Sequence, residues 1–265
     1  MPHFKAAKYV QQLPFCVIAQ YSHSRKLQLL KSGILQMMII TFASSKGGVG
    51  KSTACACLAG SLLDQGRRVH IVDLDGNRTL TRWLGPLGSD MPQLTLATPD
   101  TQALTEHLEA QGRGGAPDAI LIDVAGAYER AITVAMARAH LTIIPAAPTE
   151  ADLFEASRVA GHLKSVFAAF GREPLYRLLL TQVQPLASHA QAHAFHEVDR
   201  LALPRFDTVL THRAAYQEIG FSGKPPHLAD LARTSVQKAK AEVDAWQKEI
   251  QSLLGKKQPE RKAAA

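Results

Sequence analysis

The sequence predicts an α/β fold in which a mostly parallel β-sheet is covered by helices on both faces. From Met38 onward, short apolar runs alternate with longer stretches of helical periodicity. The apolar runs are hydrophobic at consecutive positions, as expected for strands that are buried on both faces. The chain has 265 residues, of which 46% are hydrophobic and 20% charged, so it is long and apolar enough to bury the core of such a fold.

Strands are expected at the short apolar runs. The first run leads directly into a glycine-rich turn, and the fourth is the strongest of the chain. In chain order, the expected strands cover residues 38–44, 68–73, 94–98, 119–124, 141–145, 175–181 and 205–210.

Helices are expected where apolar residues recur every three or four positions. The first ends at Gly66, and the second ends in the turn at 112–117, which is rich in glycine and contains a proline. In chain order, the expected helices cover residues 52–65, 101–111, 128–139, 150–170, 189–201 and 228–254.

The last of these helices carries an apolar stripe, which consists of Val236, Ala239, Val243, Trp246, Ile250 and Leu253. We expect the stripe to pack against its own domain. A partner or dimer helix is the second interpretation. Binding to a membrane surface is the least favoured, because the stripe contains alanine and the tail that follows it is polar.

The positive charge of the chain is concentrated at its two ends. Lys and Arg number 30 against 23 Asp and Glu, which gives a net charge of +7. Residues 1–37 contain five basic residues and no acid, and residues 255–265 contain four basic residues and one acid, so residues 38–254 are close to neutral. A high isoelectric point is therefore no argument that the body of the protein binds nucleic acid.

These charges suggest three parts: a basic extension at 1–37, an α/β domain at 38–254 and a basic, disordered tail at 255–265. For the extension, three interpretations stay open: an upstream start codon with little structural content, a basic interaction arm and a targeting peptide. The last is least favoured because the apolar stretch at 13–19 is short and interrupted.

The three cysteines are too few for a disulfide scaffold, which predicts a reduced, cytoplasmic setting. No apolar run approaches the roughly 20 residues that span a bilayer, so no integral membrane protein is expected.

A glycine-rich segment after the first strand is the strongest chemical signal. It reads Ser45, Lys46, Gly47, Gly48, Val49, Gly50, Lys51, Ser52 and Thr53, and a helix follows. Glycines let successive backbone N–H groups turn toward one anion, and the helix N-terminus adds positive potential. In such a loop Lys51 can reach the β- and γ-phosphates and Ser52 can ligate Mg²⁺. The segment therefore predicts a site for a nucleotide triphosphate and Mg²⁺.

Aspartates at the ends of two strands complete this expected site. Asp73 and Asp75 follow the second strand, and Asp123 ends the fourth. A carboxylate at the carboxyl end of a parallel strand points into the crevice that holds phosphates. We expect Asp123 to hold Mg²⁺ directly or through water, with Ser52 and Asp73 as further candidates. Asp75 or Asp73 is expected to orient the attacking water.

The general P-loop pattern has a glycine where this chain has Ser45, and the next residue is a second lysine, Lys46. With this departure, the string 46–53 resembles the deviant Walker A box of the ParA/MinD family of P-loop ATPases. The strand-end sequences 72–75 and 120–123 resemble the family's aspartate pair and its Walker B strand. The resemblance covers most of residues 38–225.

In that family the extra lysine, here Lys46, reaches the nucleotide of the partner subunit in an ATP-bound homodimer. The resemblance also favours Asp75 over Asp73 as the residue that orients water.

One branch of the family is more similar than the others. After the aspartates the chain reads Asn77, Arg78, Thr79, Leu80, Thr81, Arg82 and Trp83, which resembles the VirC-type proteins of T-DNA and conjugative transfer systems. This implies a relaxase or coupling protein as partner, where a plasmid ParA would have a partition partner. The run at 77–83 is equally well interpreted as a surface loop with Trp83 docked on the sheet or as a partner-binding loop.

Other possible ligand clusters are weaker. Cys55 and Cys57 point to different faces of one helix and are expected to be buried structural residues rather than iron–sulfur ligands. His189, His193 and His196 share helix faces, but no acidic or cysteine cluster supports a zinc site.

The sequence thus predicts a slow, partner-stimulated ATPase that dimerises with Mg-ATP and positions or segregates DNA. It is expected to bind DNA without sequence preference, and a membrane partner is not expected. Two alternatives stay open: a membrane-associated spatial regulator of the MinD kind and a nucleotide-gated protein scaffold.

Overall fold

The computed structural model describes residues 37–113, 115–124, 130–186 and 188–255. Within these residues, six parallel strands form one sheet in the order β3-β2-β4-β1-β5-β6. The strands are β1 Met38–Phe42, β2 Val69–Asp73, β3 Leu94–Ala97, β4 Ala119–Asp123, β5 Leu141–Ala146 and β6 Tyr176–Leu180. This confirms the predicted α/β class with a parallel sheet.

The helices connect the strands and cover the sheet. They are α4 Lys51–Asp64, α5 Thr79–Leu84, α6 Leu104–Gln111, α7 Arg130–Arg138, α8 Glu150–Ala168, α9 His189–Arg200, α10 Ala214–Gln217, α11 Ile219–Ser222 and α12 Thr234–Gly255. Two short 3₁₀ turns, η1 Gly85–Ser89 and η2 Pro226–Leu228, precede β3 and α12. Residues 1–36 and 256–265, which hold nearly all of the expected extension and tail, lie outside the described residues.

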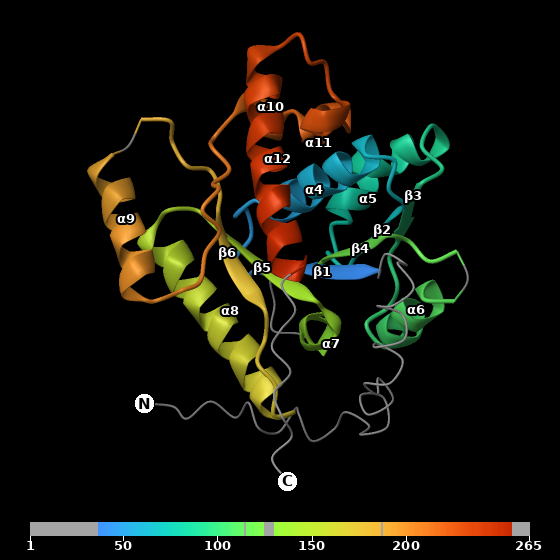
Figure 1. The fold of residues 1–265 in the computed structure, drawn as a ribbon, viewed down its shortest axis with the longest axis horizontal. Helices are drawn as coiled ribbons and strands as arrows, with labels where there is room; N and C mark the ends of the chain where they lie inside the picture. The colour runs from blue at the N-terminus through green and yellow to red at the C-terminus, as the bar shows by residue number, and fades with distance from the viewer. Residues whose placement is uncertain (1–36, 114, 125–129, 187, 256–265) are drawn as a thin grey trace.

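Two apolar layers lie on opposite faces of the sheet, because side chains alternate along each strand. From β1, Ile40 and Phe42 face one layer, which contains α4, α5 and α12. Ile39 faces the other layer, which contains α6, α7, α8 and α9. Figure 1 shows α4, α5 and α12 above the sheet and α6, α7 and α8 below it.

The apolar stripe of α12 is part of the first layer. Val236, Ala239, Val243, Trp246 and Ile250 are at most 1% exposed. The Trp246 ring lies edge-on to Phe42, with ring centroids 6.3 Å apart, and edge-on to Phe206 at 5.9 Å. Packing against the helix's own domain, the favoured interpretation, is confirmed.

The strand expected at 205–210 is wrong. This segment runs beside β6 but forms only isolated bridges, Leu178 with Arg205 and Val183 with Thr211. Phe206 N and Leu210 N donate to carbonyls of β6. Between them, the N–H groups of Asp207 and Thr208 donate to the Glu249 carboxylate of α12 at 2.8 Å, and just beyond the segment Thr211 N donates to Glu242 at 3.2 Å. Carboxylates of α12 thus interrupt what would be a seventh strand.

Two further differences concern helices. The run at 77–83, expected as a loop, contains the helix α5. Its start is capped from a distance: both the N–H and the hydroxyl of Thr81 donate to Asp73 Oδ2 at 2.9 Å. The helices α6 and α12 begin later than predicted, at Leu104 and Thr234. Local periodicity carries no signal for a cap that comes from another element.

Candidate functional site

The predicted site residues converge where β1, β2 and β4 end. In the sheet register, Phe42 is the partner of Asp123, and Asp123 is the partner of Asp73. The glycine-rich segment leaves β1 at this edge and leads into α4, which begins at Lys51. Three segments that are distant in sequence therefore meet at the carboxyl edge of the sheet, as predicted.

The glycine-rich loop has a backbone that only glycine adopts easily. Gly48 and Gly50 have φ angles of 80° and 83°, in the left-handed region. Gly50 is also the N-cap of α4. Because glycine has no side chain that could cap the helix, the first N–H groups of α4 stay available. A Cβ built at Gly47 or Gly48 would meet no described atom within 4 Å. The loop thus presents an open concave backbone that suits phosphate groups.

Lys51 stands at the centre of this site. It is 7% exposed. Among the described residues no carboxylate forms an ion pair with it. A buried ammonium without a counter-ion is costly, and an anionic ligand would relieve that cost.

Asp123 is the complementary group. Ser52 Oγ donates to Asp123 Oδ2 at 2.6 Å, whereas the buried Oδ1 has no donor among the described residues. Burial raises the pKa of Asp123 to about 7, against the lowering effects of the Ser52 hydrogen bond and the Lys51 charge, while Asp73 and Asp75 raise it further. A buried carboxylate oxygen without a donor, next to a serine hydroxyl, fits a hard divalent cation such as Mg²⁺.

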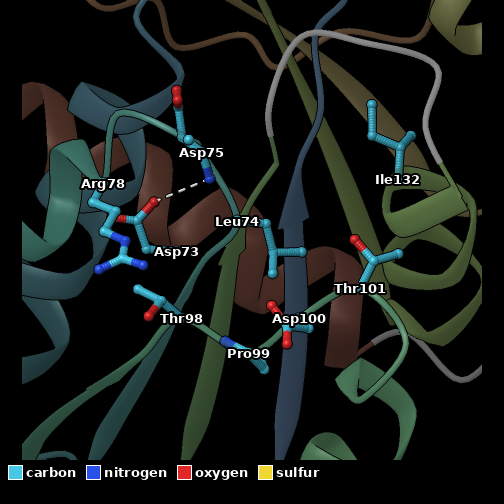
Figure 2. Close-up of a pocket in the computed structure, with 10 residues that line it drawn as sticks. Asp73, Leu74, Asp75, Arg78, Thr98, Pro99, Asp100, Thr101 and Ile132 are labelled. Atoms are coloured by element: carbon cyan, nitrogen blue, oxygen red, sulfur yellow. Dashed lines mark hydrogen bonds between the residues drawn. The ribbon is translucent and has the colours of Figure 1, made fainter.

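Asp73 and Asp75 line a neighbouring cavity of about 220 Å³ (Figure 2), together with Arg78, Thr98 and Asp100. Asp73 is buried, and its second oxygen, Oδ1, accepts from Asp75 N at 3.2 Å. Asp75 is partly exposed and accepts from Asn77 N at 2.9 Å. Asp73 therefore holds the loop and α5, while Asp75 has an oxygen directed away from these bonds.

Lys46 does not point into this site. Its Nζ lies 2.5 Å from Asp152 Oδ1 on α8, and the side chain is 46% exposed. The preceding Ser45 donates to Glu155 on the same helix at 2.7 Å. The start of the loop is thus fastened to α8, and Lys46 is held at the surface.

Two residues after β6 also hold the loop, and sequence reasoning missed both. Thr181 Oγ1 donates to the carbonyl of Val49 at 2.8 Å, and Gln182 Nε2 donates to that of Gly48 at 2.6 Å. Gln182 adopts a φ of 55°, an uncommon conformation for a residue with a side chain. More than 130 residues separate these partners, so no local pattern could have indicated them.

The remaining candidates have structural explanations. Cys55 and Cys57 are fully buried, and burial raises the pKa of both thiols. No cluster of three potential metal ligands occurs in the described ranges, the helix with His189, His193 and His196 included. In the same part of the chain, no helix is both long and apolar enough to cross a bilayer.

Comparisons with known proteins show which family the chain belongs to. A family model described as VirC1 protein matches residues 37–243. A ParA protein from Rhizobium radiobacter is 26% identical over 186 residues, which cover 69% of this chain and 82% of the relative. A virC1 protein from the same organism is 34% identical over 123 residues, or 45% of this chain, and the match spans 53% of that relative's length.

Solved structures share the fold. An ATP complex of McdA from Cyanothece has a TM-score of 0.63 at 18% identity, and the match covers 85% of this chain and 99% of the other. The septum site-determining protein MinD from Pyrococcus horikoshii, solved with Mg-ADP, has a TM-score of 0.61 at 20% identity. The match covers 83% of this chain and 100% of the other.

Proposed function

The chain belongs to the VirC1 family, within the ParA/MinD group of P-loop ATPases, and from this we propose that it binds Mg-ATP, dimerises around two nucleotides and hydrolyses them slowly to position or segregate DNA. Two groups at the mouth of the glycine loop carry the proposal: in the part of the chain that the structure describes, the buried Lys51 forms no ion pair and the buried Asp123 Oδ1 has no donor. One group suits the phosphates of ATP and the other suits the cation that accompanies them.

In this proposal the loop binds the nucleotide. N–H groups of Gly47, Gly48, Val49 and Gly50 and of the first turn of α4, with Ser52 and Thr53, surround the phosphates, and Lys51 neutralises them. Ser52 and Asp123 would hold Mg²⁺, with Asp73 behind them. When bound, the ion supplies charge neutralisation to the transferred phosphoryl group.

Asp75 has the role of orienting water. It is partly exposed beside the cavity and is held in place through Asn77 N, whereas both oxygens of Asp73 are engaged. Positioning is the main demand that phosphoryl transfer makes on a protein. The resemblance and the geometry therefore favour the same residue.

Lys46 would act across the dimer, toward the nucleotide of the partner subunit. For this it must leave Asp152, with which it forms an ion pair. Dimerisation thus requires a rearrangement between the loop and α8.

The role in DNA positioning, in conjugative transfer or in plasmid partition, rests on the family and on its relatives' names. Two basic residues beyond β6, Arg213 and Lys224, are candidates for contacts with DNA; Arg213 forms an ion pair with Glu242, and Lys224 is exposed. The membrane alternative loses support because the α12 stripe that would serve as anchor is buried.

Three variants test the proposal, each through the step that it should block: ATP binding, dimerisation or turnover. Lys51→Ala is expected to lose ATP binding by calorimetry, because it removes the cation that neutralises the phosphates. Lys46→Ala is expected to bind ATP but stay monomeric by light scattering, and Asp75→Ala to bind and dimerise without turnover. Lys238→Ala, an exposed lysine on α12, is the control and should behave as the parent. An unchanged dissociation constant for Lys51→Ala would refute the nucleotide site.

A further inference from the structure

Two short helices from distant parts of the chain, α5 and α11, are packed closely together. The ring of Trp83 on α5 lies over Gly220, where a Cβ would approach the ring to 3.4 Å. At Gly223 a Cβ would lie 2.5 Å from the Trp83 carbonyl oxygen, and the φ of 67° also favours glycine. Figure 1 shows α11 next to α5, and the two helices are in contact. Only glycines allow this approach.

This contact creates a surface that is both cationic and aromatic. We define the α5–α11 patch as Arg82, Trp83, Phe221 and Lys224. Phe221 is 93% exposed, and Trp83 is partly exposed. Residues 79–89 and 219–229, which carry the patch, contain no Asp or Glu. Within the described ranges, its two cations form no ion pair.

We propose that the α5–α11 patch binds single-stranded DNA, with Arg82 and Lys224 on phosphates and the Phe221 ring stacked on a base. Single strands are bound by combining cations that follow the backbone with aromatic rings that stack on exposed bases. The patch offers both within two segments that contact each other. The choice of DNA as the ligand rests on the proposed function, but none of the residues that form the patch belongs to the proposed nucleotide site.

The surroundings of Phe221 favour a base over a protein groove. Its chain neighbours are Gly220 and Ser222, and Lys224 follows. A protein partner would need a contiguous apolar area around the ring, as interface anchors have, whereas the chain around Phe221 is small, polar and basic and the adjoining Trp83 is only partly exposed. A base needs only one aromatic face, and the nearby cations take its phosphates. A duplex would use the cations and leave the ring without a partner, because its bases are already stacked.

The patch is also attached to the nucleotide site. The two aspartates at the end of β2 hold the start of the segment that forms α5: Asp73 through Thr81, and Asp75 through Asn77. The bound single-stranded DNA and the bound nucleotide would therefore lie on the two sides of the short loop between β2 and α5.

The test measures binding of a labelled oligo-dT of about 20 nucleotides by anisotropy, without nucleotide, against a duplex of equal length. The parent is expected to prefer the single strand, and Phe221→Ala to weaken it about tenfold, the typical loss of one base–aromatic stack. Arg82→Glu should weaken both DNAs. With two phosphate contacts, the slope of log K against log salt should be about −1.4. Leu186→Ala and Lys238→Glu remove an exposed apolar residue and a cation elsewhere, and serve as matched controls.

Intrinsic fluorescence gives a second readout that does not depend on the label. The chain has two tryptophans, and Trp246 is fully buried. Oligo-dT should therefore quench the Trp83 emission in the parent and in Lys51→Ala, whose nucleotide site is impaired. Quenching in Lys51→Ala supports the patch whatever the fate of the ATPase proposal.

Several results would overturn the proposal: no binding of oligo-dT, equal affinity of the parent and Phe221→Ala, tighter binding of the duplex, or preference for oligo-U over oligo-dT. A loss of ATP-dependent dimerisation in Phe221→Ala would also overturn it, because the ring would then contact a second copy of the chain. Since Phe221 is exposed, its replacement should leave the thermal unfolding curve unchanged, which separates lost binding from lost folding.

Discussion

Two borders of the sheet are built in opposite ways. One is the carboxyl edge, where the strands end at the proposed nucleotide site, here called the nucleotide edge; the other is the side of the sheet beyond β6. At the nucleotide edge, β1 and β4 are paired on both sides, and among the residues that the structure describes Lys51 has no ion pair and Asp123 Oδ1 has no donor. Beyond β6, the segment at 204–213 has no regular strand pairing, yet carboxylates of α12 accept from several of its N–H groups. One edge keeps unpaired polar groups for a ligand, and the other uses polar groups to complete the fold. Substitutions should therefore separate into those that change binding and those that change stability.

The largest expected effect on stability lies on the α12 side. Trp246→Ala should lower the free energy of unfolding by about 3–5 kcal/mol, because it leaves a cavity between Phe42 and Phe206. Urea denaturation measures this. Trp246→Phe should cost much less, since the buried Trp246 Nε1 has no acceptor among the described residues and no hydrogen bond is lost. If Trp246→Ala weakened ATP binding at unchanged stability, the division between the two edges would be wrong.

The next effect concerns the nucleotide edge and depends on pH. Burial raises the pKa of Asp123 to about 7 from its ordinary value of 3.8. Between these values the folded chain binds more protons than the unfolded chain, so stability should fall as pH rises from about 4 to about 7, by about 1 kcal/mol per pH unit. Urea unfolding at pH 5, 6 and 7 tests this in the absence of Mg²⁺. Asp123→Asn should remove this contribution; an unchanged slope would contradict it.

A smaller effect is expected at Glu242, which joins α12 to the segment beyond β6. It accepts from Arg213, from the Tyr216 hydroxyl at 2.8 Å and from Thr211 N. Glu242→Gln should therefore cost about 1–2 kcal/mol of stability in urea denaturation, with ATP affinity unchanged. The control is Glu197→Gln, which breaks an exposed pair with Arg200 within one helix and should show no measurable change. Equal losses in both variants would show that the segment does not depend on α12.

The two edges also differ in how far the sequence predicts them. Six of the seven expected strands are confirmed, and the glycine loop and the three aspartates lie together as predicted, because strand ends and loop residues are local in sequence and a parallel sheet brings them to one edge. Asp152, Thr181 and Gln182 were not, since their contacts with the loop span more than 100 residues. The strand expected at 205–210 failed for a related reason. Its apolar pattern is real and Phe206 N and Leu210 N do bond to β6, but the N–H groups between them donate to a carboxylate on α12, which no local pattern records.

The smallest effect sharpens the comparison at the contact between the glycine loop and α8. The Lys46–Asp152 ion pair is half exposed on the lysine side, so it should contribute less than about 1 kcal/mol to stability. If Lys46 must leave Asp152 to act across the dimer, this small energy opposes dimerisation. Asp152→Asn keeps the size of the side chain and removes its charge. It should therefore tighten the ATP-dependent dimer about two- to fivefold by light scattering. Glu155→Gln, on the same helix and bonded to Ser45 instead, is the matched control and should change the dimer less. A weaker dimer in Asp152→Asn would mean that Asp152 itself supports the interface, and that the ion pair is not an obstacle to it.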